Sequence, residues 1–252
     1  MPSVFLQFKH GIPYHFSASI AAEGFRQLGY EIIPFDLGDL STMRWSPEIP
    51  VFACVGAIKV ALAALGFSPL IETYPKELLP FLNRSLDVTQ LGRLSPGDLP
   101  LFIKPKLQHK RFTGFVCNDV LDRRLGGISP EFEIYVSNPV DILSEYRCYV
   151  LNGKILSIAR YRGSVEHFPN VAIVREMICA YLDAPISYGL DVGITSKGET
   201  LLVEVNDSTS LGNYGLPPTL FAKMIAARWF QITGQDYSEE ADCFDSPSFI
   251  SN

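Results

Sequence analysis

The Asn152-Gly153 pair, set between two runs of strand-forming residues, constrains the fold of this chain more than any other feature. Two-residue hairpin turns need positive φ angles, which Asn and Gly adopt readily. The flanking runs, 145–151 and 155–161, therefore predict an antiparallel hairpin. Strand-like patterns recur at 101–104, 112–117, 133–137, 187–194 and 200–206, with helical patterns at 170–182 and 218–233. This half of the chain is thus expected to form antiparallel sheets with a few helices.

The N-terminal part shows a different pattern, in which strands and helices alternate. Strands are predicted at 4–8, 30–35 and 51–55, and helices at 17–29 and 57–65, with Ser17 as an N-cap and Gly29 as a C-cap. Such alternation is typical of a small parallel α/β layer. A polar helix at 76–83 and a segment rich in Gly and Pro follow. We expect an α/β domain over 1–95, an α+β domain of antiparallel sheets over 96–234, and an acidic tail over 235–252.

Charge and hydropathy exclude several functional classes. The chain has 21 basic and 27 acidic residues, a net charge of -6, and no dense basic run of the kind that binds a nucleic-acid backbone. The longest apolar run, 60–67, is far shorter than the ~20 residues that span a membrane. The N-terminus lacks the pattern of a secretory signal. We therefore expect a cytoplasmic protein that binds neither nucleic acid nor membrane.

Three oxygen-bearing side chains mark one predicted hairpin. Glu204 and Asn206 point to the same face of strand 200–206, and Asp191 lies on the preceding strand, where it can meet Glu204. Such hard oxygen donors suit Mg²⁺, which completes its shell with water and nucleotide phosphates. A hairpin with a polar, solvent-facing side explains the composition equally well, although such a face usually mixes in Lys, Thr and Ser.

Cations occur in the same half of the chain. Lys104 ends the strand 101–104, and Glu145 and Arg147 share one strand face. With Lys110, Arg160 and Arg162 they form the charge pattern that a phosphate clamp needs. The alternative is a set of surface ion pairs, each contributing about 0.2 to 1 kcal/mol.

Taken together, these segments resemble the ATP-grasp superfamily of carboxylate–amine ligases. The resemblance rests on Phe-Ile-Lys-Pro at 102–105, the run 145–154 with Arg160 after it, Gly-Leu-Asp-Val-Gly at 189–193, and Leu-Val-Glu-Val-Asn at 202–206. It covers residues from about 100 to 233. The N-terminal units are similar to the superfamily's preceding α/β domain in topology only.

The resemblance implies a role for each matching residue. Lys104 is expected to contact the nucleotide phosphates, and Glu145 the ribose. Arg147 and Arg160 are expected to hold the γ-phosphate or an acyl phosphate, and Asp191, Glu204 and Asn206 to ligate Mg²⁺. The segment 133–137, with Glu133, Tyr135 and Val136, corresponds to a hinge whose backbone reads adenine. The loop 105–114 departs from the family's glycine-rich pattern, so Lys110 is expected to take over the role of backbone amides.

Substrate residues are less well marked. The loop 207–215 offers Ser210 and Asn213, while Arg162 and, at the end of the first strand, His15 are further candidates. The resemblance implies an ATP- and Mg²⁺-dependent ligase that joins a carboxylate of an amino acid or peptide to an amine through an acyl phosphate, releasing ADP. A non-catalytic ATP-binding protein and a small-molecule kinase of the same fold remain alternatives. The oligomeric state stays open, a homodimer included.

Overall fold

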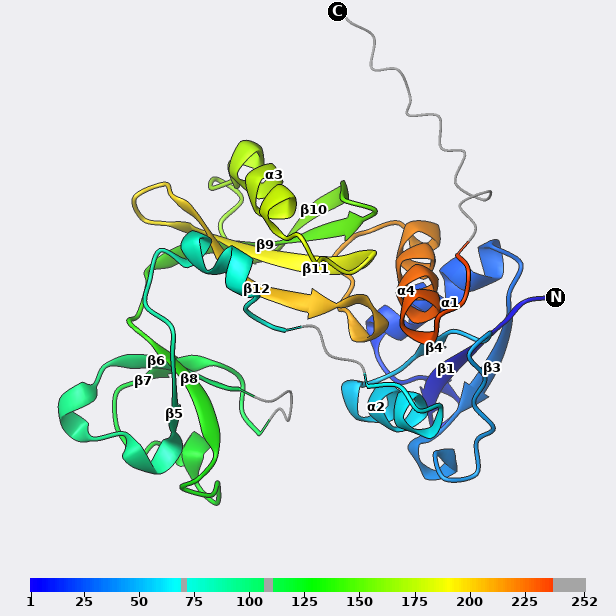
Figure 1. Ribbon diagram of the computed structural model, residues 1–252, viewed down its shortest axis with the longest axis horizontal. Coiled ribbons are helices and arrows are strands. Elements are labelled where there is room, and N and C mark those ends of the chain that lie inside the picture. Colours follow the sequence, from blue (N-terminus) through cyan, green and yellow to red (C-terminus); the bar gives the residue numbers. More distant parts are fainter. Residues whose placement is uncertain (69–71, 107–110, 238–252) are drawn as a thin grey trace, which may run out of the picture.

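The computed structural model describes residues 1–68, 72–106 and 111–237, which form three sheets and four α-helices (Figure 1). The N-terminal layer lies on the right of the view, the largest sheet in the centre, and a smaller antiparallel sheet at the lower left. A parallel layer followed by antiparallel sheets is the fold class expected from the sequence, and it is confirmed.

The N-terminal layer is built around β1 (Ser3–Lys9). Two strands pair with it in parallel, β3 (Glu31–Phe35) and β4 (Val51–Phe52), while the short β2 (Ile12–Pro13) pairs with its end in antiparallel fashion. Helices α1 (Phe16–Gln27) and α2 (Val55–Ala64) connect the parallel strands. The apolar side chains of β1 and β4 are buried on both faces, as a parallel layer requires.

The start of α1 differs from the expectation. His15, not Ser17, is the N-cap, and its Nδ1 accepts a hydrogen bond from the Ser17 backbone N–H at 3.2 Å. Ser17 lies inside the helix, where its hydroxyl is buried and accepts the backbone N–H of Asn213 at 2.9 Å. A hydroxyl that tertiary structure needs elsewhere is not free to cap its own helix.

The small sheet has the order β5-β8-β6-β7 and is antiparallel throughout. Its strands are β5 (Asp87–Gln90), β6 (Leu101–Pro105), β7 (Phe115–Cys117) and β8 (Glu133–Ser137). Strand β5 was not expected in this turn-rich segment. The helix predicted at 76–83 is a 3₁₀ helix, Lys76–Leu82, which contains Pro80. Proline removes a backbone donor and disfavours a regular α-helix at this point.

The large sheet has the order β10-β9-β11-β12 and is also antiparallel. Its strands are β9 (Ile142–Leu151), β10 (Lys154–Gly163), β11 (Ser187–Thr195) and β12 (Thr200–Asp207). Asn152 and Gly153 have φ of 50° and 69°, so the predicted hairpin is confirmed. Helix α3 (Val171–Ala180) covers one face, where Val174 and Met177 share a core with alternate side chains of β9.

Helix α4 (Pro218–Thr233) joins the large sheet to the N-terminal layer. It packs along α1, and its Phe221 and Ile225 lie in one buried core with Val4 and Phe25. Trp229, further along α4, completes a second N-terminal core. The last helix of the chain therefore supplies much of the interior of the first layer.

Among the described residues, no helix combines the length and the apolar character that crossing a bilayer takes. The predicted acidic tail lies outside the described residues apart from 235–237.

Candidate functional site

A row of charged side chains crosses three strands of the large sheet. Arg147 on β9 is the register partner of Asp191 on β11, and Asp191 is the register partner of Glu204 on β12. Direct partners in adjacent strands point to the same face. The topology thus brings together three predicted site residues that are far apart in sequence, in the order cation, carboxylate, carboxylate.

Arg147 and Asp191 form a buried, two-pronged ion pair. Arg147 Nε and Nη2 donate to the two Asp191 oxygens at 2.8 and 2.7 Å, and Nη1 donates to the Gly212 carbonyl at 3.2 Å. The two side chains are only 8% and 2% exposed. Burial alone would lower the pKa of Arg147, but the neighbouring Asp191 carboxylate raises it above its usual value. The guanidinium therefore stays charged and is held in one orientation.

Aromatic side chains enclose this guanidinium. The rings of Tyr161 on β10 and Tyr214 stack at 5.1 Å, and Arg147 lies 5.9 and 5.1 Å from their centroids. The Tyr149 hydroxyl donates to the Gly212 carbonyl at 3.0 Å and accepts the Tyr214 N–H at 2.8 Å, which fixes the loop after β12 above Arg147. Sequence reasoning missed all three tyrosines. Strand alternation could have found Tyr149, because it lies two residues from Arg147 on the same face.

Gly189 explains why the loop can come so close. A Cβ at this position would lie 2.7 Å from Leu211 Cδ1 and 3.2 Å from Arg147 Nε. Any larger residue on this strand would displace the loop or the guanidinium. The glycine in the Gly-Leu-Asp segment is thus required by a close approach.

Lys104 reaches the row from the small sheet. It lies on β6 and forms an ion pair with Glu204 on β12, so this contact joins the two sheets. The Asn206 amide nitrogen donates to Glu204 Oε1 at 3.0 Å and to Asp191 Oδ2 at 3.1 Å. Burial would lower the pKa of Lys104, but Glu204 raises it; conversely, burial would raise the pKa of Glu204, but Lys104 lowers it. Both groups are therefore charged at neutral pH.

Two tyrosines form the surroundings of Lys104. Its ammonium lies 5.2 Å from the ring centroid of Tyr74, which packs edge to face against Tyr135 at 4.9 Å. Tyr135 on β8 is the register partner of Lys104. The junction between the sheets thus combines a cation, a carboxylate and an aromatic pair.

The expectation that the backbone of 133–137 reads adenine is wrong for most of this segment. Ile134, Tyr135 and Val136 are paired with β5 on one side and β6 on the other. A central strand has no backbone hydrogen-bonding groups left for a ligand. Glu133 is close to Lys106, at 3.1 Å, and Val136 is half-buried against the core of the small sheet.

A β-bulge in β10 decides which arginine meets Glu145. Arg162 is opposite Glu145 and forms an ion pair with it, whereas Arg160 is opposite Tyr146 and donates to the Gly163 carbonyl. Between Arg160 and Arg162 the register shifts. The structure therefore brings Arg162, and not Arg160, beside Glu145, because the extra residue changes which side chains share a face.

The remaining candidates lie on the side of α1. Asn213 is buried, and its side chain holds the loop by donating to the Leu216 carbonyl at 2.9 Å and accepting the Gly215 N–H at 2.8 Å. Ser210 ends a short 3₁₀ helix, Ser208–Ser210, and is half-buried. His15 is exposed at the start of α1. Lys110 lies outside the described residues.

The donor chemistry of Asp191, Glu204 and Asn206 fits Mg²⁺. Each carboxylate oxygen has two lone pairs, so the Asp191 oxygens that accept from Arg147 keep capacity for a second partner. No donor among the described residues reaches Asn206 Oδ1. Within the same ranges, no three His, Cys, Asp or Glu side chains gather as a metal site, since the third donor here is an amide.

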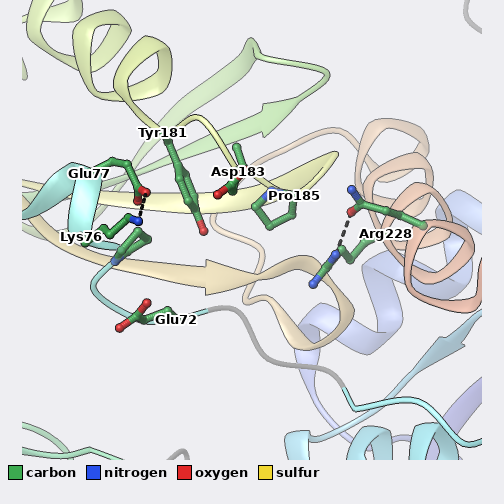
Figure 2. A pocket seen from close by; sticks show the side chains of 10 residues that line it. Glu72, Lys76, Glu77, Tyr181, Asp183, Pro185 and Arg228 are labelled. Carbon is green, nitrogen blue, oxygen red and sulfur yellow. Dashed lines mark hydrogen bonds and ion pairs between the residues drawn. The ribbon is translucent and has the colours of Figure 1, made fainter.

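Two cavities in the described part of the chain lie away from this junction. One, of about 430 Å³, opens between the 3₁₀ helix Lys76–Leu82 and α4, and Figure 2 shows its lining. The other, of about 350 Å³, lies against β5 and β8. Lys104 and Glu204 line neither of them, so their ion pair occupies the space between the sheets.

Comparison with known families decides the relationship of this fold. Residues 81–224, more than half of the chain, match a family described as an ATP-grasp domain, the second family of its clade. The chain belongs to this ATP-grasp family. The match begins before β5 and includes Lys104, Arg147, Asp191 and Glu204, so the whole charged row lies inside the ATP-grasp domain. A search of curated proteins finds no match.

Solved structures with the ATP-grasp fold are similar over nearly the full length. D-alanine–D-alanine ligase from Bacillus anthracis is 14% identical with a TM-score of 0.55, covering 92% of this chain and 98% of that one. The macrocyclase MdnC from Microcystis aeruginosa, bound with the precursor peptide MdnA, is 10% identical with a TM-score of 0.52, covering 93% and 100%. The ATP-grasp ligase PsnB, complexed with a precursor variant, Mg and ADP, is 13% identical with a TM-score of 0.51, covering 90% and 98%. At these identities the similarity establishes the fold.

Proposed function

We propose that this ATP-grasp chain is an ATP- and Mg²⁺-dependent ligase that joins a carboxylate to an amine and releases ADP. The observation that carries the proposal is the charged row that runs from Arg147 through Asp191 to Glu204 and ends on Lys104 of the other sheet. Cations and oxygen donors alternate at the junction of two sheets, which is the arrangement that a triphosphate with its metal ion requires.

The Lys104–Glu204 ion pair is the point at which a nucleotide would enter. A phosphate oxygen can replace Glu204 as the partner of Lys104, and this frees the carboxylate. Glu204, Asn206 and Asp191 would then hold Mg²⁺, which neutralises phosphate charge when it is bound. Tyr74 and Tyr135, next to Lys104, offer ring faces and edges at the same junction.

Arg147 has the properties of a fixed cation for the transferred group. Three of its five N–H groups are used by Asp191 and Gly212, which leaves two for an oxygen of the phosphoryl group. Its burial under Tyr161 and Tyr214 strengthens any such interaction, because little water competes there.

The chemistry needs positioning more than a dedicated nucleophile. The substrate carboxylate forms a bond to the γ-phosphorus while the bond to the bridging oxygen breaks and ADP leaves. The amine nitrogen then bonds to the acyl carbon, and inorganic phosphate and a proton are released. The residues of the row supply charge neutralisation in both steps. Ligases among the solved structures of this fold, such as D-alanine–D-alanine ligase, add support for this reaction class.

Glu204→Gln tests the proposal. The substitution keeps the size of the side chain but removes the charge that pairs with Lys104 and would bind Mg²⁺, so ATP turnover should fall by about 100-fold or more. Glu199→Gln, at an exposed position in the turn of the same hairpin, is the matched control and should leave turnover unchanged. Circular dichroism and urea unfolding establish that both variants are folded. Full activity in Glu204→Gln would overturn the assignment.

The reaction type is tested by measuring ADP release against pools of amino acids and dipeptides. Ligation predicts that ADP and inorganic phosphate appear together only when a carboxylate and an amine are both present. ADP formation with a single acceptor, without free phosphate, identifies a kinase instead. AMP as the product contradicts the acyl phosphate route.

A further inference from the structure

The cavity of about 430 Å³ lies on the other side of β12 from the charged row (Figure 2). Glu204 and Asn206 point to one face of this strand, so Val205 and Asp207 point to the opposite face. Val205 lies in the core beneath α3, and Asp207 binds Arg228 of α4, which lines the cavity. The cavity is therefore separate from the proposed ATP site.

One side of the cavity presents hydrogen-bond donors. Arg228 is buried; its Nε donates to Asp207 at 3.0 Å and its Nη1 to Gln231 at 2.7 Å, and its Nη2 has no partner among the described residues. Gln231 Oε1 also accepts the Ile186 N–H at 3.0 Å, which turns the amide nitrogen of Gln231 toward the cavity. Figure 2 shows the Arg228 guanidinium extending into the space that the Tyr181 ring also faces.

Tyr181 supplies an unpaired polar group to the same space. The residue is only 8% exposed, yet its hydroxyl has no hydrogen-bond partner among the described residues, and it points into the cavity in Figure 2. Burial raises the pKa of Tyr181 to about 12, so the hydroxyl is a neutral donor at physiological pH. A buried polar group without a partner is unfavourable, and a ligand oxygen would satisfy it.

Carboxylates line the rest of the cavity. Glu72 precedes the 3₁₀ helix Lys76–Leu82, Glu77 lies within it, and Asp183 belongs to the connection between α3 and β11. Only Glu77 has an ionic partner within reach among the described residues. That partner, Lys76, is 3.8 Å away and largely exposed. The carboxylates thus create a negative region opposite the buried guanidinium.

We infer that this cavity binds a small zwitterion, an α-amino acid or a short peptide. Its carboxylate would accept from Arg228, Tyr181 and Gln231, and its ammonium would face Glu72, Glu77 and Asp183. A simple anion would be repelled by the three acids, and a simple cation would leave Arg228 and Tyr181 unsatisfied. A cavity of about 430 Å³ matches the lower range of small-molecule sites. The inference does not depend on the proposed ligase reaction.

The experiment measures binding to the full chain without nucleotide. Glycine, L-alanine, L-glutamate and glycylglycine are titrated by isothermal calorimetry and by amide chemical shifts, with propionate and ethylamine as single-charge controls. At least one zwitterion should bind at least tenfold more tightly than either control and should shift the amides of 181–186 and 228–231. Binding of no zwitterion, or equal binding of propionate, overturns the inference.

A pair of matched variants assigns the binding to this cavity. Tyr181→Phe removes only the hydroxyl and should weaken zwitterion binding about tenfold, because it deletes a hydrogen bond to a charged group. Tyr188→Phe makes the same change in the ring that packs against Tyr181 at 5.5 Å, but Tyr188 does not line the cavity, so binding should be unchanged. Equal effects of the two variants contradict the assignment. Asp183→Asn should weaken the zwitterion and leave propionate unaffected or bound more tightly; the opposite pattern also overturns it.

Discussion

At the scale of single residues, Tyr188 carries a hydroxyl that is buried without a hydrogen-bond partner in the described part of the chain. The residue is 1% exposed and lies in the core beneath α3. Leaving such a group unsatisfied costs about 1–3 kcal/mol. Tyr188→Phe should therefore raise the free energy of unfolding by about 1 kcal/mol, measured by urea denaturation. A loss of similar size would mean that the hydroxyl has a partner, such as a buried water molecule.

Three further tyrosines predict how stability depends on alkaline pH. Burial raises the pKa of Tyr14, Tyr149 and Tyr181 from 10.0 to about 12. The folded state then holds these protons more tightly than the unfolded state, so the stabilisation is complete below pH 10 and is lost as the pH rises toward 12. Unfolding free energy should fall across this window. Ultraviolet titration should show these phenols ionising later than the exposed ones; simultaneous ionisation of all tyrosines would contradict their burial.

At the scale of elements, the contact between α1 and α4 depends on Gly24. A Cβ on Gly24 would lie 1.9 Å from the Pro218 carbonyl oxygen, which is backbone and cannot move aside. Gly24→Ala should destabilise the protein by about 2 kcal/mol or more, because the two helices must separate. Gly56→Ala is the matched control, since Gly56 lies exposed in α2 with open space around it and alanine favours a helix. A stabilising Gly24→Ala would show that the helices do not pack in this way.

The elements also show how far the sequence predicts the site. Strand alternation and the Asn152-Gly153 turn are local, and they sufficed to predict β9, β10 and the shared face of Glu204 and Asn206. The bulge in β10 inserts one residue, and no local pattern announced it, so Arg160 was expected where Arg162 lies. The Lys104–Glu204 contact joins sheets 100 residues apart in sequence, so the resemblance predicted a role for both residues but not their ion pair. The loop over Arg147 depends on tertiary contacts of Tyr149 and Ser17 that periodicity does not contain.

At the scale of the whole molecule, the first layer and the last helix fold as one interior. Residues 1–95 were expected to form a separate domain, and this division stays a prediction. The core around Val4 and Phe25 is shared with Phe221 and Ile225 of α4. Trp229 Nε1 and Thr233 Oγ1 each donate to the Pro47 carbonyl at 3.0 Å, which ties the end of α4 to the N-terminal layer.

A fragment of residues 1–95 should therefore not fold by itself. Without α4, the apolar faces of α1 and β1 that pack against Phe221 and Trp229 would face water, at about 25 cal/mol per Å² of exposed apolar surface. Most small domains have only about 5–15 kcal/mol of stability, so the loss of this helix removes most of the margin. Far-ultraviolet circular dichroism and urea unfolding of the fragment should show no cooperative transition, whereas residues 1–237 should unfold in one. A cooperative transition in the isolated fragment would mean that its own strands and helices suffice, and that α4 docks onto a layer already formed.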